Sequence, residues 1–184
     1  MKRLVMLMSL LLSLGGMVAA EGTAPQYRYG SRGYFGTARA NVQTMSAFWF
    51  NDPAVGVDII NGYSFNPWFM LGGGVGFIYT CVPGEGAVRI PIYLHLRANV
   101  LDRKVTPFFA LNLGGGFCKG YQHGFTNGAA EEPNGHYWFS CIEPQMGVAV
   151  YLKNGRMIDF GASIYLDAGR GLNGGLKFGI GFTW

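Results

Sequence analysis

The stretch that decides the fold is LNGGLKFGIGFTW, residues 172–184. Apart from Gly174, every second position from Leu172 carries Leu, Phe, Ile or Trp, and the positions between carry Asn, Gly, Lys or Thr. Side chains of a β-strand point alternately to opposite faces, so the large apolar groups share one face. The other face is mostly glycine, as expected where strands crowd a narrow interior. The stretch therefore predicts a strand of a closed barrel with its apolar face outward.

The same alternation recurs along the chain, most clearly in residues 88–100, where the even positions are all apolar. Residues 55–65, 142–152 and 159–167 alternate as well, and glycine-rich stretches at 69–79, 106–118 and, most weakly, 33–41 complete a set of eight. Short connections at 66–68, 101–104 and 153–156 alternate with connections at 43–53, 81–86, 119–136 and 168–170, of which three are longer. Outer-membrane barrels have short periplasmic turns and longer extracellular loops. The sequence therefore predicts an all-β fold: a closed up-and-down antiparallel transmembrane β-barrel of eight strands.

The composition agrees with a surface that does not face water. Hydrophobic residues make up 49% of the chain and charged residues 13%, whereas soluble domains carry about 25% charged residues. The one uninterrupted apolar stretch lies at the N-terminus, so no helix of about 20 apolar residues is available to span a bilayer. The net charge of +4 is dispersed along the chain, and we expect no nucleic-acid partner.

Residues 1–20 have the three parts of a secretory signal. Lys2 and Arg3 are followed by an apolar core and then by small residues that end at Ala20. We expect cleavage near Ala20 rather than an uncleaved anchor, because the apolar core is short. The predicted organisation is a signal peptide at 1–20, a short periplasmic segment at 21–31 and the barrel at 32–184, integral to a bacterial outer membrane.

The predicted inward face collects charged and titratable side chains. They are Arg39, Asp58, Arg89, His95, Arg97, Glu143, Asp159 and Lys177. They could form an ion path or a ligand site, or a network that fills the lumen. We favour the filled lumen, because eight strands leave an interior just wide enough for side chains and because buried charges need partners of opposite sign.

The last eight residues resemble the C-terminal assembly signal of outer-membrane proteins at Lys177, Gly179, Phe182 and Trp184. This resemblance implies recognition by the barrel-assembly machinery, after escort by periplasmic chaperones.

Residues 71–77, 90–94 and 105–116 resemble the small outer-membrane barrels of the OmpA-like and opacity-type families, particularly those of the Bacteroidetes. The resemblance covers nearly all of the mature chain, but no peptidoglycan-binding domain follows Trp184, so we expect no cell-wall tether of that kind.

Three cysteines are present: Cys81, Cys118 and Cys141. Strand parity places Cys118 and Cys141 inward, at the two ends of the connection 119–136. Because the periplasm is oxidising, a disulfide between them is one prediction and three free thiols is the other.

Candidate catalytic residues gather around the connection 119–136. His123, His136, Glu131, Glu132 and Ser140 lie there, but no Gly-x-Ser-x-Gly turn exists and the spacing matches no metal-ligand pattern. We therefore expect no catalytic site, metal or cofactor.

The predicted function is that of a non-enzymatic barrel with a structural or adhesin-like role. It contacts outer-membrane lipid, and it contacts an extracellular ligand through residues 119–136. The alternatives are a narrow pore for small solutes or ions and an envelope lipid-modifying enzyme.

Overall fold

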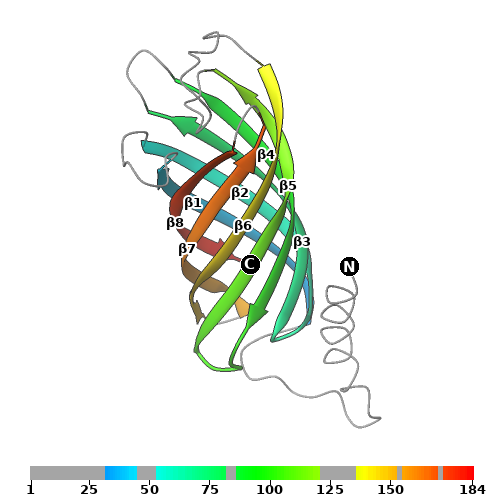
Figure 1. Ribbon diagram of the computed structural model, residues 1–184. Coiled ribbons are helices and arrows are strands. Elements are labelled where there is room, and N and C mark those ends of the chain that lie inside the picture. Colours follow the sequence, from blue (N-terminus) through cyan, green and yellow to red (C-terminus); the bar gives the residue numbers. More distant parts are fainter. Residues whose placement is uncertain (1–31, 45–52, 82–85, 121–135, 153–154, 170–171) are drawn as a thin grey trace, which may run out of the picture.

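The computed structural model describes residues 32–44, 53–81, 86–120, 136–152, 155–169 and 172–184. Its eight strands are β1 (Gly33–Thr44), β2 (Pro53–Asn66), β3 (Phe69–Thr80), β4 (Val88–Asn99), β5 (Val105–Lys119), β6 (His136–Tyr151), β7 (Met157–Ala168) and β8 (Leu172–Thr183). Each strand pairs with the next and β1 pairs with β8, so the sheet is a closed antiparallel barrel (Figure 1). The predicted fold class and strand number are confirmed, and the weakest predicted strand, 33–41, extends to Thr44. No helix in the described part of the chain is long and apolar enough to cross a membrane.

The seam between β1 and β8 closes the barrel and is formed, on the β8 side, by residues of the stretch 172–184. Its register runs from Thr37 opposite Thr183 to Gln43 opposite Lys177. Beyond it, Gly36 and Trp184 exchange two backbone hydrogen bonds of 3.1 and 2.9 Å. Trp184 therefore continues the ladder past the end of β8.

The two faces of the sheet are inverted relative to those of a soluble barrel. On β4 the inward side chains Arg89, His95 and Arg97 are each 2% exposed, whereas Ile92 between them is 61% exposed. The outward faces of the other strands are likewise apolar, with Phe160 and Ile180 about half exposed. Because apolar groups gain free energy on leaving water, this outer surface fits a lipid environment. The predicted alternation of faces is confirmed.

The connections differ between the two ends of the barrel. At one end, which we call the turn end, strands are joined through 67–68, 100–104 and 152–156; at the other, the loop end, they are joined through 45–52, 81–87, 120–135 and 169–171. The tight turn between β2 and β3 is held by Asn66, whose Oδ1 accepts hydrogen bonds from the backbone N–H groups of Trp68 and Phe69 at 2.9 and 2.8 Å. Asparagine commonly stabilises turns in this way.

Candidate functional site

All eight residues of the predicted charge network point into the lumen. None of them is more than 3% exposed. A ninth titratable side chain, Asp167 on β7, is 2% exposed and forms an ion pair with Arg89. The described lumen then holds four basic groups (Arg39, Arg89, Arg97 and Lys177) and four carboxylates (Asp58, Glu143, Asp159 and Asp167), so its formal charge balances to zero with His95 neutral.

One ion-pair group centres on Asp159. Its Oδ1 lies 3.0 Å from Nη2 of Arg39, and its Oδ2 lies 2.8 Å from Nη1 of Arg97. Arg39 also donates a 2.7 Å hydrogen bond to Oε1 of Gln145. The four side chains come from β7, β1, β4 and β6, so the group spans the lumen and ties together strands that are not neighbours.

A second ion-pair group centres on Lys177. Its Nζ lies 3.0 Å from Oδ2 of Asp58 and 3.3 Å from Oε2 of Glu143. Ser163 donates to Oε1 of Glu143 at 2.7 Å, and Asn112 donates to Oε2 at 3.2 Å. Both oxygens of Glu143 are therefore occupied, which is what a buried carboxylate requires.

His95 belongs to the same group and is not a free acid or base. Its Nδ1 lies 2.7 Å from Oδ1 of Asn112, whose amide in turn donates to Glu143. The ring is 2% exposed. In this structure His95 therefore serves in packing and hydrogen bonding within the lumen.

Glycines on neighbouring strands make room for this network. A Cβ at Gly181 would lie 2.8 Å from Oδ1 of Asp159, and one at Gly76 would lie 2.5 Å from Oδ1 of Asp58. Gly179 lies under Arg39 in the same way, with its Cβ position 3.1 Å from Cδ of the arginine. The glycine-rich inward face therefore has a steric cause: Asp159, Asp58 and Arg39 each lie over a position without a side chain.

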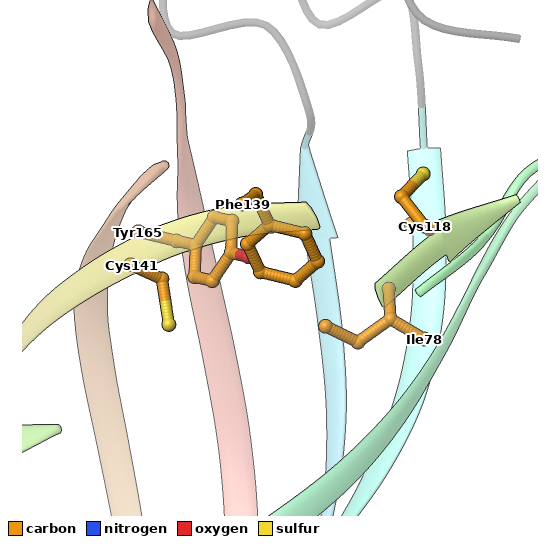
Figure 2. Close-up of a cluster of buried hydrophobic side chains, with 6 residues drawn as sticks. Ile78, Cys118, Phe139, Cys141 and Tyr165 are labelled. Carbon is orange, nitrogen blue, oxygen red and sulfur yellow. The ribbon is translucent and has the colours of Figure 1, made fainter. Parts of the chain in front are cut away.

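Hydrophobic clusters lie across both ends of the lumen. At the loop end, Ala54, Ile78, Cys118, Phe139, Cys141 and Tyr165 pack together, as Figure 2 shows for the larger side chains. At the turn end there are two clusters, one of Phe108, Ala110, Ala149, Tyr151 and Met157 and one of Phe35, Ile60, Met70 and Tyr93. Arg97 joins the polar layer to the turn end, because its guanidinium carbon lies 3.9 Å from the centre of the Phe108 ring.

The predicted disulfide between Cys118 and Cys141 is absent. All three cysteines are free thiols. Both residues face inward, as strand parity requires, but the register of β5 and β6 pairs Cys141 with Gly114 and Cys118 with Tyr137. The two positions are thus offset by four residues, about 13 Å along the strand, beyond the span of about 4.4–6.8 Å between the Cα atoms of a disulfide. Figure 2 shows the ring of Phe139 between the two sulfurs.

The candidate catalytic residues are not brought together in the described structure. His123, Glu131 and Glu132 lie outside the described residues. The ring of His136 stacks on Phe117, with 5.4 Å between the ring centres, and Ser140 is exposed on the outward face of β6. Within the described ranges, no group of three or more His, Cys, Asp or Glu side chains is placed to hold a metal ion.

The residues of the predicted assembly signal divide between the two faces of β8. Lys177 is buried in the lumen, and Gly179 lies on the same face. Phe182 and Trp184 point outward, 39% and 53% exposed, with 6.2 Å between their stacked rings. Asp167, Asn112, Gln145, Asn41 and Ser163 also belong to the lumenal network and were missed as site residues. The signal available in the sequence was their strand parity, which places each of them inward.

Comparison with known proteins identifies similar folds among solved structures but no related sequence. No protein-family model and no curated protein matches the chain. Among solved structures, Neisserial surface protein A matches with a TM-score of 0.62 and 12% identity, over 82% of this chain and 95% of that one. The N-terminal β-barrel domain of Pseudomonas aeruginosa OprF matches at 0.54 and 10% identity, over 84% and 100% of the two chains.

A third solved structure is the outer membrane enzyme PagL, which matches with a TM-score of 0.51 and 14% identity, over 80% of this chain and 97% of that one. At such low identity, the three likenesses are evidence of architecture alone. The inverted faces, the closed eight-stranded sheet and these similarities lead to one conclusion: the chain has the fold of the small outer-membrane β-barrels.

Proposed function

We propose that the chain is an integral outer-membrane barrel that acts as a rigid scaffold and presents residues 119–136 for contact outside the cell. The observation that carries this proposal is the filled lumen: its eight charged side chains are at most 3% exposed and are balanced in sign. An interior of this kind offers no surface to a partner. Binding then falls to the loop end, since loops on rigid scaffolds commonly carry function.

The strands that flank residues 119–136 are the longest of the barrel. β5 has 15 residues and β6 has 16, and in Figure 1 the yellow start of β6 reaches furthest toward the loop end. Phe117, His136 and Trp138 form an aromatic group there, with 5.4 and 6.0 Å between the ring centres. Trp138 is 75% exposed. Strands β5 and β6 therefore extend beyond their neighbours, and among the described residues at that end Trp138 is the most exposed aromatic side chain.

The narrow pore remains the second candidate function, and the filled lumen counts against it. A continuous water path would leave the charged side chains accessible, whereas Asp159 and Asp58 are 0% and 1% exposed. A lipid-modifying enzyme is a third class, because one similar structure is an outer membrane enzyme. No described residue of this chain favours that class.

The test is replacement of residues 121–135 by a short Gly-Ser linker. We expect the shortened barrel to keep heat-modifiable migration in gel electrophoresis and to lose adhesion of whole cells to host cells or matrix. Protease added to intact cells should cleave the unmodified chain at Lys119. A matched variant with a linker of equal length between Pro67 and Trp68, at the turn end, should retain adhesion. Adhesion that survives removal of 121–135 would contradict the proposal.

A further inference from the structure

Basic side chains gather at the turn end of the barrel. Arg103, Lys104 and Arg156 are exposed, and Asp102 is the one acidic residue in the described connections there. The connections that carry them are close together. The backbone N–H of Tyr151 donates to the carbonyl of Lys104 at 2.8 Å, and that of Leu152 donates to the carbonyl of Arg156 at 2.7 Å. The three cations therefore lie around the turn end of β6 and β7.

An apolar groove lies on the outer face of the same two strands. It has a volume of about 790 Å³ and also reaches β8 and β1. It is lined by small residues (Ala40, Gly147, Gly161, Ala162 and Gly179), by larger apolar side chains (Val42, Met146, Val148, Phe160, Phe178 and Ile180) and by one polar residue, Asn41. The groove is open to the outside rather than enclosed. The lining is almost wholly apolar, so an aliphatic chain suits it.

The spacing between the cations and the groove matches one lipid molecule. Phe160 and Ala162 follow Arg156 on β7 by four and six residues, which is about 13 and 20 Å along the strand. Membrane strands tilt by about 35–45°, so these positions lie about 10–15 Å below the level of Arg156. One leaflet of a bilayer has a hydrocarbon depth of about 15 Å, half of the whole core. A headgroup at Arg156 would therefore place its acyl chain in the groove.

We propose that this face of β6 and β7 binds an anionic phospholipid of the leaflet at the turn end. Its phosphate would lie among Arg103, Lys104 and Arg156, and an acyl chain would fill the groove beside Ala162. The proposal rests on the membrane location argued above. A zwitterionic lipid has no net charge to attract the three cations. By contrast, each basic residue near an anionic surface raises the binding constant by about fivefold. The site should therefore select lipids by headgroup charge.

The experiment is native mass spectrometry of the folded barrel, released from detergent that contains equal amounts of dioleoyl phosphatidylglycerol and dioleoyl phosphatidylcholine. We expect at least fivefold more phosphatidylglycerol than phosphatidylcholine among the retained lipids. The triple variant Arg103→Gln, Lys104→Gln, Arg156→Gln should bring this ratio close to one. Ala162→Phe, which fills the groove, should reduce retention of both lipids and leave their ratio unchanged. The matched controls are Lys119→Gln at the loop end and Ile92→Phe on the outer face of β4, and neither should change the result.

Several outcomes would overturn the proposal. These are equal retention of the two lipids by the unmodified barrel, an unchanged ratio in the triple variant, or unchanged retention in Ala162→Phe. Displacement of the lipid by glycerol phosphate at the same concentration would mean a phosphate site that does not use the groove, and would also overturn it. Heat-modifiable migration confirms folding of each variant. A barrel that inserts into vesicles but shows no lipid preference contradicts this site alone, whereas failure to insert into any vesicle contradicts the proposed function.

Discussion

Arg97 and Asp159 form an ion pair, with 2.8 Å between Nη1 and Oδ2, although they lie on β4 and β7, which are not neighbours in the barrel. Arg39 on β1 binds the other oxygen of the same carboxylate at 3.0 Å. One buried carboxylate thus connects three separate strands across the lumen. This cross-strand connection is added to the backbone ladders and makes the interior a structural element rather than a passage.

Asp159→Ala should destabilise the barrel strongly. It would leave two buried guanidinium groups without their shared counterion, and breaking a buried ion pair costs about 3–5 kcal/mol. The free energy of unfolding in urea, measured in lipid vesicles, checks this value. Lys119→Gln removes an exposed charge and should change it by no more than about 0.5 kcal/mol. Similar changes in the free energy of unfolding for the two variants would mean that the lumenal network contributes little to stability.

Adjacent glycines on β3 provide a second test. A Cβ at Gly74 would lie 2.3 Å from Cε2 of Tyr93, whereas a Cβ at Gly73 would have its nearest neighbour, the carbonyl oxygen of Tyr93, 4.0 Å away. Gly74→Ala should therefore destabilise the barrel by about 1–3 kcal/mol through overpacking. Gly73→Ala should be neutral or stabilising by about 0.5–1 kcal/mol, because it restricts the unfolded chain. The same unfolding assay separates them, and equal effects would contradict the inward position of Gly74.

The three thiols should differ in reactivity. Cys81 is exposed, whereas Cys118 and Cys141 are 0% and 8% exposed. A maleimide should add one label per folded chain and three labels after denaturation, as counted by intact mass. Cys81→Ser should leave the folded barrel unlabelled. A linked Cys118–Cys141 peptide in a non-reduced digest would contradict the register of β5 and β6.

Loss of the Trp184 side chain should impair assembly before it impairs any activity. The indole lies over Gly36, where a Cβ would be 2.6 Å from the ring, and the ring covers the seam between β1 and β8. Trp184→Ala should lower the amount of barrel in outer-membrane fractions, scored by heat-modifiable migration. Trp138→Ala, at the loop end, should assemble normally. Equal assembly of the two variants would remove the role we propose for Trp184 as part of the assembly signal.

The folded barrel should give no single-channel steps in a planar bilayer. Its lumen is occupied by paired charges between hydrophobic clusters, so an ion would have to displace an ion pair to cross. Discrete conductance steps from protein with confirmed heat-modifiable folding would favour the pore over the scaffold. Steps that also appeared with the unfolded chain would instead indicate leakage around the protein.

Much of the barrel could be predicted from period-two alternation. It assigned Lys177, Arg97 and Asp159 to the lumen because successive strand side chains face opposite sides, whatever the neighbouring strand. It also placed Cys118 and Cys141 inward correctly. Of the two alternatives for the cysteines, the structure has the free thiols; parity could not choose between them, because it fixes the face of a residue but not its height, and height depends on the register between strands. Asp167 was left out of the network although the same parity places it inward; only the structure shows that it pairs with Arg89, 78 positions away in the sequence.

By itself, then, the sequence determined the strands, their inward and outward faces, and the closed form, because each of these follows from local side-chain order and from the need to satisfy the backbone in lipid. Only the tertiary structure decided which lumenal charges meet, which glycines lie beneath them, and that the connections carrying Lys104 and Arg156 meet at the turn end of β6. These relations depend on the stagger of eight strands around a closed ring. No single strand contains that stagger, since it is set by all the pairings together.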